Sequence, residues 1–232
     1  MSGTPPPGDG PRVAMILAAG RGERMRPLTD RVPKPLLAVR GKPLIEYHVE
    51  RLAQAGVERI VINLAWLGNL IRDALGDGSR YGLTIEYSDE APQALETGGG
   101  IFRALPLLGE GAFLVVNGDV FSDFPFGRAR LGPGRDAHLV LVPNPPQHPH
   151  GDFGLERGIA LPDAEVRYTF AGIAAYRREF FADSPGGAFP LRPLMVRAMA
   201  AGRCSAELYR GLWQDVGTVE RLRALNAEGG AS

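Results

Sequence analysis

The feature that most constrains the fold is an apolar strand that runs directly into a long loop. The apolar run is Val13–Leu17, and the loop after it has no hydrophobic period of its own. A short run without polar residues is typical of a strand buried on both faces of a parallel sheet. Two closely spaced glycines let the backbone turn sharply beside a ligand, and four cations follow within fourteen residues: Arg21, Arg24, Arg26 and Lys34. This pattern predicts an anion-binding loop.

Two familiar phosphate-binding motifs do not fit this loop. The third glycine of a dinucleotide-binding fingerprint would fall at Met25, and the lysine of a Walker motif is missing. Pro27, Pro33 and Pro35 remove backbone donors and fix an extended path, so the loop wraps around its ligand rather than opening a helix. We therefore expect it to surround a polyphosphate.

The loop also carries an ordered signature, L-A-A-G-x-G-x-R-x-x-P-L-T over residues 17–29 and P-K-P-L over residues 33–36. It resembles the signature of the sugar-1-phosphate nucleotidyltransferases, and the resemblance extends from Ala14 to about Asn226. Within that family the chain most resembles the short uridylyltransferases of peptidoglycan recycling that act on N-acetylmuramate 1-phosphate. The resemblance implies a single α/β domain over residues 12–228, with a Rossmann-like (GT-A-like) fold and a mostly parallel sheet flanked by helices.

Composition narrows the class of protein. The 232 residues, 44% of them hydrophobic, can bury one sizeable core. A formal net charge of zero gives no field that would draw the chain to nucleic acid or to an anionic membrane. The single cysteine, Cys204, excludes an internal disulfide and is expected to be inert. Residues 1–11 are expected to be a flexible tail, and no segment is apolar enough to span a bilayer. We expect a cytoplasmic protein, monomeric or weakly dimeric.

The rest of the chain alternates between helical and strand patterns. Apolar residues at helical spacing predict helices over residues 43–55, 67–75, 101–108, 191–201 and 218–226, the last one capped by Thr218. Apolar or alternating runs predict strands over residues 59–63, 83–87, 113–116 and 168–176. The alternation favours a doubly wound sheet, in which ligands bind at the carboxyl ends of the strands.

A second glycine-rich turn, E-T-G-G-G over residues 96–100, precedes an apolar helical segment. Backbone at a helix entrance can approach a flat ligand, although a plain helix start fits the same residues. In the resembled family this turn contacts the nucleobase. The nucleotide site implied by the resemblance comprises Ala18, Ala19, Gly20, Arg21, Gly22, Glu23, Arg24, Gly98, Gly99 and Asn117. Glu90 and Glu96 are further candidates for accepting a base N–H.

An acid follows the strand expected over residues 113–116, in the sequence N-G-D that ends at Asp119. Such an aspartate either caps the following turn or binds a cation, and the nearby phosphate loop favours the cation. Asp215 also ends an apolar stretch, and we expect the two carboxylates to share one Mg²⁺. Asp119 with Asp123 also loosely resembles the two-aspartate motif of metal-dependent glycosyltransferases, so that class stays open.

The proline-rich segment 143–151 predicts a surface loop. His148 and His150 alternate within it, but no further His or Cys lies nearby to complete a metal site. The resemblance places sugar recognition after this loop, at Asp152, Gly154, Glu156, Thr169 and Gly172. A bulge is the other explanation for the small residues at 171–172. Arg157, Arg167 and loop amides are the candidates for binding the lactyl carboxylate of a muramate.

The chemistry implied by the resemblance joins UTP to a sugar 1-phosphate and releases pyrophosphate. No protein base is required, because a phosphate monoester with a second pKa of about 6 is already an anion at neutral pH. Arg24, Lys34 and Asp119 are then the catalytic candidates, and they act by positioning and charge. The alternatives are a mannose-1-phosphate guanylyltransferase, a glucose-1-phosphate uridylyl- or thymidylyltransferase, a glycosyltransferase and a non-catalytic nucleotide-sugar sensor.

Overall fold

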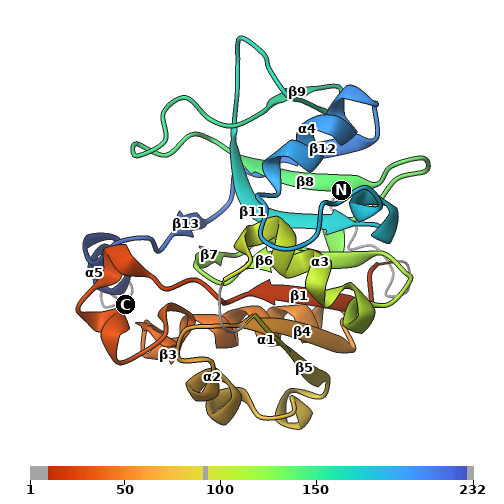
Figure 1. Ribbon diagram of the computed structural model, residues 1–232. Coiled ribbons are helices and arrows are strands. Elements are labelled where there is room, and N and C mark those ends of the chain that lie inside the picture. The colour runs from red at the N-terminus through yellow and green to blue at the C-terminus, as the bar shows by residue number, and fades with distance from the viewer. Residues whose placement is uncertain (1–9, 91–93, 229–232) are drawn as a thin grey trace.

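The computed structural model describes residues 10–90 and 94–228. They form one α/β domain around a nine-stranded sheet (Figure 1). Its strands, in spatial order, are β5 (Thr84–Asp89), β4 (Arg59–Leu64), β1 (Val13–Leu17), β6 (Phe113–Asn117), β11 (Thr169–Tyr176), β8 (Ala137–Val142), β12 (Cys204–Leu208), β10 (Ile159–Leu161) and β9 (Gly154–Glu156). All of them except β11 and β10 run in one direction, which confirms the expected mostly parallel sheet. Most of the expected tail, residues 1–9, lies outside the described residues.

Helices cover both faces of the sheet because strand side chains alternate between the faces. On one face, Ala14 and Ile16 of β1 pack with α1 (Leu44–Gln54) and α2 (Gly68–Leu75). On the other face, Met15 packs with α3 (Glu96–Leu108) and α4 (Arg192–Ala200). The last helix, α5 (Val219–Glu228), packs in a small third cluster with the segment between β1 and α1 and with Phe121 and Val216.

Each helix and strand that the sequence predicts is present, and most ends agree within two residues. Thr218 caps α5 as expected, because its Oγ1 accepts a hydrogen bond from the Arg221 N–H at 3.3 Å. The prediction for α3 is wrong at its start, since the helix begins at Glu96 and takes in the three glycines that were expected to precede it. The sequence pattern does not predict β8 or β12, and β12 carries a serine and a glutamate among its five residues.

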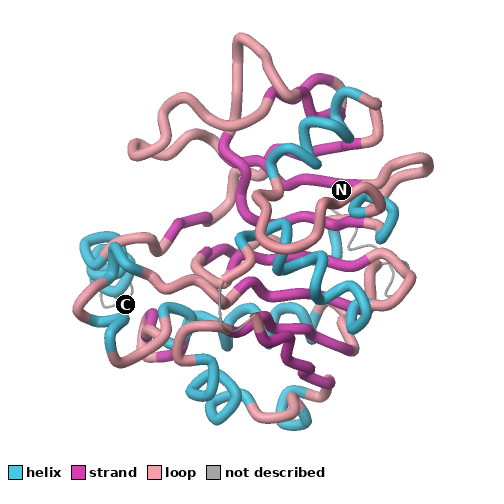
Figure 2. Tube along the Cα trace, in the orientation of Figure 1, coloured by secondary structure: helices cyan, strands magenta, loops and turns pink. Residues whose placement is uncertain are grey.

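The segment between β1 and α1 occupies the side of the sheet toward which β1 and β6 point (Figure 1). Figure 2 shows that it is mostly loop, interrupted by short helical turns, which are Glu23–Met25, Leu28–Asp30 and Lys34–Leu36. Two small antiparallel ribbons flank it: β2 (Ala38–Val39) with β3 (Lys42–Pro43), and β7 (Val120–Ser122) with β13 (Trp213–Asp215). The carboxyl ends of the central strands are thus surrounded by irregular segments.

Two further expectations concern the core and the membrane. Cys204 is buried, and burial raises the pKa of its thiol to about 12, so the thiol stays protonated at neutral pH, as expected for an inert cysteine. Among the described residues, no helix has both the length and the apolar character needed to cross a bilayer.

Candidate active site

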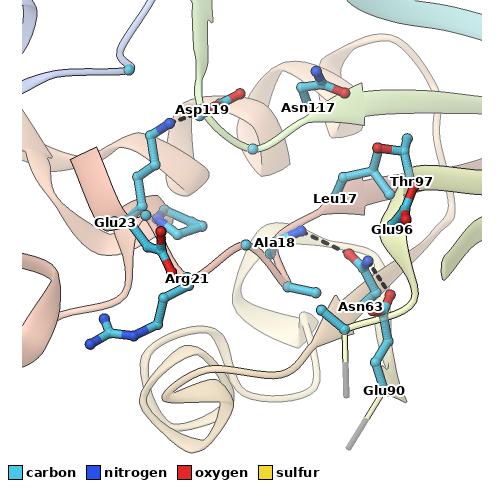
Figure 3. A pocket seen from close by; sticks show the side chains of 18 of the residues that line it. Leu17, Ala18, Arg21, Glu23, Asn63, Glu90, Glu96, Thr97, Asn117 and Asp119 are labelled. Atoms are coloured by element: carbon cyan, nitrogen blue, oxygen red, sulfur yellow. Dashed lines mark hydrogen bonds and ion pairs between the residues drawn. The ribbon is translucent and has the colours of Figure 1, made fainter. Parts of the chain in front are cut away.

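A cavity of about 660 Å³ lies beyond the carboxyl ends of β1 and β6 (Figure 3). The loop after β1 forms one wall, and the start of α3 forms another. Ten residues that the sequence analysis assigns to the site line this cavity: Ala18, Ala19, Gly20, Arg21, Gly22, Glu23, Arg24, Lys34, Asn117 and Asp119. Glu90 and Glu96, the further candidates for accepting a base N–H, line it as well. The tertiary structure therefore brings together the phosphate loop and the acid that follows β6.

The closest contact across the cavity joins Lys34 to Asp119. The Lys34 Nζ lies 2.5 Å from the Asp119 Oδ2. The lysine side chain is only 11% exposed and the aspartate side chain is 36% exposed, so water screens this pair less than it screens a surface ion pair. Pro33 and Pro35 flank the lysine and are both buried, which fixes the backbone that carries it. Lys34 thus directs a cation into the cavity.

Arg21 shapes the loop rather than reaching across the cavity. Its guanidinium donates to the Thr29 carbonyl and to the Asp30 carboxylate, both at 2.9 Å, and stacks 3.7 Å from the ring centroid of Trp66. The Trp66 indole N–H donates to the same Thr29 carbonyl at 2.9 Å. The hydrogen bond from Arg21 and the charge of Arg26 lower the pKa of Asp30. The loop is therefore tied to itself and to the segment after β4.

Gly22 allows the loop to fold back on itself. Its φ of 68° is in the left-handed region, and a Cβ there would lie 2.9 Å from the Thr29 methyl group. The Thr29 hydroxyl donates to the Gly22 carbonyl at 2.8 Å. Arg24, by contrast, is exposed at the cavity and forms no ion pair within residues 10–90 and 94–228, so its charge is available to a ligand.

Asp119 and Asp215 lie on neighbouring backbones, because Asp215 of β13 pairs with Val120 of β7 and the Val216 N–H donates to the Asp119 carbonyl at 2.9 Å. The Asp215 carboxylate accepts a hydrogen bond from Arg221 at 2.5 Å. Two carboxylates fit the needs of Mg²⁺, which takes one or two carboxylates from a protein and its other oxygens from water and phosphate. In the described part of the chain, no cluster of three or more acidic, His or Cys side chains could hold a metal alone.

His48 of α1 lies beneath this ribbon and is a residue that the sequence analysis misses. It is 3% exposed, and its burial lowers the pKa of its imidazole to about 4, although the charge of Asp119 and a hydrogen bond with the Val120 backbone oppose that shift. The imidazole is therefore neutral at physiological pH. Only its helical spacing with apolar neighbours indicates its burial in the sequence.

The far end of the cavity is formed by Asn63, Glu90 and the start of α3. Both carboxylate oxygens of Glu90 accept hydrogen bonds, one from Asn63 at 2.6 Å and one from the Leu95 N–H at 2.8 Å. Gly98 and Gly99 are buried and do not line the cavity, because their Cα atoms face residues 187–189. The Gly99 N–H donates to the Phe189 carbonyl at 3.1 Å, so the structure uses these glycines for close packing.

None of the five residues assigned to sugar recognition lines this cavity, although Asp152 and Thr169 lie on adjacent segments. Gly154 and Glu156 lie on the edge strand β9. The Asp152 carboxylate braces the backbone, since its Oδ2 accepts from the Phe170 N–H at 2.8 Å. The Thr169 hydroxyl donates to Asn144 at 3.0 Å. Only Gly172 adjoins the cavity, as described next.

Gly172 lies at a bulge in β11, where the pairing with β8 shifts between Phe170 and Ala174. Its φ is 71°, and a Cβ there would lie 2.6 Å from the side-chain nitrogen of Asn117, which lines the cavity. Glycine at this position therefore makes room for Asn117. Both the bulge and the close approach to the site follow from one small residue.

Asn63 and Trp66 are the main site residues that the sequence analysis misses. Asn63 is a polar residue near the carboxyl end of a strand that is apolar from Ile60 to Ile62, which is a recognisable signal in a parallel sheet. Trp66 follows the same strand, and no local pattern links it to Arg21, forty-five positions away.

The chain is similar to known proteins both in sequence and in fold. The nucleotidyl transferase family model matches residues 13–156. The chain is 53% identical to the N-acetylmuramate alpha-1-phosphate uridylyltransferase of Neisseria meningitidis serogroup B, over 94% of this chain and 98% of that protein. It is 39% identical to the enzyme of the same name from Caulobacter vibrioides, over 94% and 96%.

A solved structure shares the fold. The inositol-1-phosphate CTP transferase from T. maritima superposes with a TM-score of 0.78 at 17% identity, over 95% of this chain and 97% of that one. At that identity the likeness concerns the fold alone. The family model and the two relatives, which match over nearly their whole length, identify the family as well as the fold. The chain belongs to the nucleotidyl transferase family, among its sugar-1-phosphate nucleotidyltransferases.

Proposed function

We propose that this enzyme transfers the uridylyl group of UTP to N-acetylmuramate 1-phosphate and releases pyrophosphate. The observation that carries the proposal is one cavity in which the glycine loop, Lys34 and Asp119 meet. The identity of 53% to the Neisseria meningitidis enzyme supports this pair of substrates. We further propose that the enzyme acts in peptidoglycan recycling in the cytoplasm, as a monomer or weak dimer.

In the proposed reaction, a phosphate oxygen of the sugar 1-phosphate attacks the α-phosphorus of UTP. The bond from that phosphorus to the bridging oxygen of the β-phosphate breaks, and pyrophosphate leaves with its electron pair. The nucleophile is already an anion, so the remaining difficulty is the repulsion between two phosphates. Lys34 offsets that repulsion at the reacting phosphates, and Arg24 with the amides of residues 20–22 binds the triphosphate.

We propose Asp119 and Asp215 as ligands of a magnesium ion. Their separate ion pairs with Lys34 and Arg221 keep both carboxylates oriented beside the loop. When bound, Mg²⁺ neutralises phosphate charge and aligns the phosphate oxygens. With a metal on Asp119, Lys34 would be available to bind a substrate phosphate instead.

A glycosyltransferase is disfavoured because Asp119 and Asp123 face different cavities. Asp123 lines a second cavity, of about 1040 Å³, between α1 and residues 123–130, and accepts a hydrogen bond from the Tyr209 hydroxyl. The two aspartates therefore do not form one metal site. Another sugar-1-phosphate nucleotidyltransferase, with mannose or glucose 1-phosphate, remains the second candidate.

The test offers the enzyme several nucleoside triphosphates with several sugar 1-phosphates and measures nucleotide sugars by mass spectrometry. We expect UDP-N-acetylmuramate and pyrophosphate in equal amounts, and only with Mg²⁺. Faster turnover of mannose 1-phosphate with GTP would select the second candidate. Consumption of UDP-sugar without pyrophosphate would indicate a glycosyltransferase, and binding without turnover of any pair would indicate a sensor.

A further inference from the structure

A chain of three hydrogen bonds crosses the end of the cavity away from Asp119, and Figure 3 shows the first two of them. The Ala18 N–H donates to the Asn63 Oδ1 at 2.7 Å. The Asn63 Nδ2 donates to one oxygen of Glu90 at 2.6 Å, and the other oxygen accepts from the Leu95 N–H at 2.8 Å. The chain thus joins the first residue after β1, the end of β4, the residue after β5 and the residue before α3.

The network is buried and has only one possible arrangement. Asn63 is 3% exposed and Glu90 is 2% exposed, so a missing partner would be costly for either group. The Ala18 N–H can only donate, which directs the amide oxygen of Asn63 toward it and leaves the NH₂ group facing the carboxylate. A Cβ on Gly100 would lie 2.3 Å from the Glu90 oxygen, so a glycine there keeps the space open.

Its position assigns the network to the nucleoside half of the ligand. The cations Lys34 and Arg24 both belong to the loop wall, and Lys34 contacts Asp119, so this wall marks the phosphate end. Asn63 and Glu90 mark the other end in Figure 3. A triphosphate held at the first end directs its nucleoside toward the second, between Ala18 on one wall and the start of α3 on the other.

We propose that Asn63 is a positioning residue for the nucleoside end of the triphosphate. Its amide sets the spacing between Ala18 and Glu90, and through Glu90 the spacing to Leu95. The two walls that receive the nucleoside are therefore held at a fixed separation before the ligand arrives, which lowers the cost of binding. The inference takes the identity of the nucleotide from the proposed function. The hydrogen-bond network itself does not depend on which sugar 1-phosphate is the substrate.

A charge swap tests this role. N63D directs a carboxylate at the carboxylate of Glu90, so the middle hydrogen bond becomes a repulsion. In N63D/E90Q the side chain at position 63 still accepts from the Ala18 N–H, and the amide oxygen at position 90 still accepts from the Leu95 N–H. The hydrogen bond between positions 63 and 90 is kept but reverses its direction, since the amide at position 90 now donates. The single and double variants carry similar side-chain volumes, and the double variant restores the net charge of the wild type.

The readout is the dissociation constant of whichever nucleoside triphosphate the wild type binds most tightly, measured by calorimetry with Mg²⁺. We expect N63D to bind at least about tenfold more weakly and N63D/E90Q to return to within about threefold of the wild type. The KM for the sugar 1-phosphate should stay within about twofold in both. N226D is the matched control, since Asn226 also bridges two backbone groups, at Arg40 and Ala38, but lies outside the cavity.

The role is refuted if folded N63D binds nucleotide as the wild type does, or if N63D/E90Q binds no better than N63D. Thermal unfolding checks folding, and should N63D not fold, E90Q takes its place, because its NH₂ group must then face the donor of either Asn63 or Leu95. A wild type that binds nucleotide but does not turn over N-acetylmuramate 1-phosphate would refute the proposed substrate pair and leave this comparison intact.

Discussion

The Lys34 Nζ and the Asp119 Oδ2 lie 2.5 Å apart, although eighty-five positions separate the two residues in the chain. The pair connects the loop after β1 to the turn after β6, two strands that are parallel neighbours in the sheet. Each group therefore depends on the sheet for its partner. The pair gathers a cation and a prospective metal ligand at the phosphate end of the cavity.

Lys34→Met should abolish most turnover without unfolding the protein. The substitution keeps an unbranched side chain of similar length but removes the charge that offsets phosphate repulsion, so we expect a loss of at least about a hundredfold in kcat/KM. Pyrophosphate release measures it. Lys42→Met is the matched control, because Lys42 forms a comparable 2.5 Å ion pair with Glu50 away from this cavity. Wild-type rates in Lys34→Met would remove this lysine from the mechanism.

Asp119→Asn and Asp215→Asn should each lower turnover by about a thousandfold, which at 1.4 kcal/mol per decade corresponds to about 4 kcal/mol of transition-state stabilisation. The amide keeps the shape of the carboxylate but binds Mg²⁺ weakly. Excess chelator should have a similar effect on the wild type. Asp183→Asn serves as control, since Asp183 pairs with Arg197 on an exposed surface. Activity that survives chelation would show that the two aspartates do not share a metal.

Trp66→Leu should raise the KM for the triphosphate by about tenfold, because the loop loses the platform on which Arg21 stacks. Trp66→Phe keeps an aromatic ring but not the N–H that donates to the Thr29 carbonyl, so we expect an intermediate effect. Steady-state kinetics with each substrate varied in turn distinguish this from a general loss of activity. An unchanged KM in Trp66→Leu would mean that the loop keeps its shape unaided.

Gly98→Ala should destabilise the fold by about 1–3 kcal/mol, because the new methyl group would lie 2.4 Å from the ring of Phe189. Gly111→Ala, where nothing lies within 4 Å of the added carbon, should stay within about 0.5 kcal/mol of the wild type. Urea unfolding measures both. If Gly98→Ala is as stable as the control but binds nucleotide weakly, the glycine serves the ligand rather than the packing.

The buried His48 should make stability depend on pH between 6.5 and 4. Its pKa is about 4 in the folded protein and 6.5 when exposed, so the unfolded chain binds more protons in this range. The contribution is therefore complete above pH 6.5 and is lost as the pH falls toward 4, by up to about 1.4 kcal/mol per pH unit. Urea titrations of the wild type and His48→Gln at several pH values isolate it, because the variant should lack this slope. Equal slopes would show that His48 does not contribute.

The sequence by itself determines most of the framework. The apolar run of β1, the glycines after it and the alternation of helix and strand depend on local preferences and hydrophobic period, which act within a few residues. They place the loop and Asp119 at the same edge of the sheet, because parallel strands end on the same side. The ten predicted residues that line the cavity all follow from this rule or from the family signature.

Tertiary structure decides which partners those residues take. Arg21 lines the cavity, and its guanidinium binds the loop itself and Trp66. Gly98 was expected at a nucleobase, yet it packs against Phe189, and Asp152 braces a strand instead of facing the cavity. Trp66, Phe189 and Phe170 each lie at least eighteen positions from these residues, so no local pattern contains them. The role of a buried polar group or of a glycine depends on which groups the packed core places next to it. Those neighbours are determined only when the strands and helices pack together.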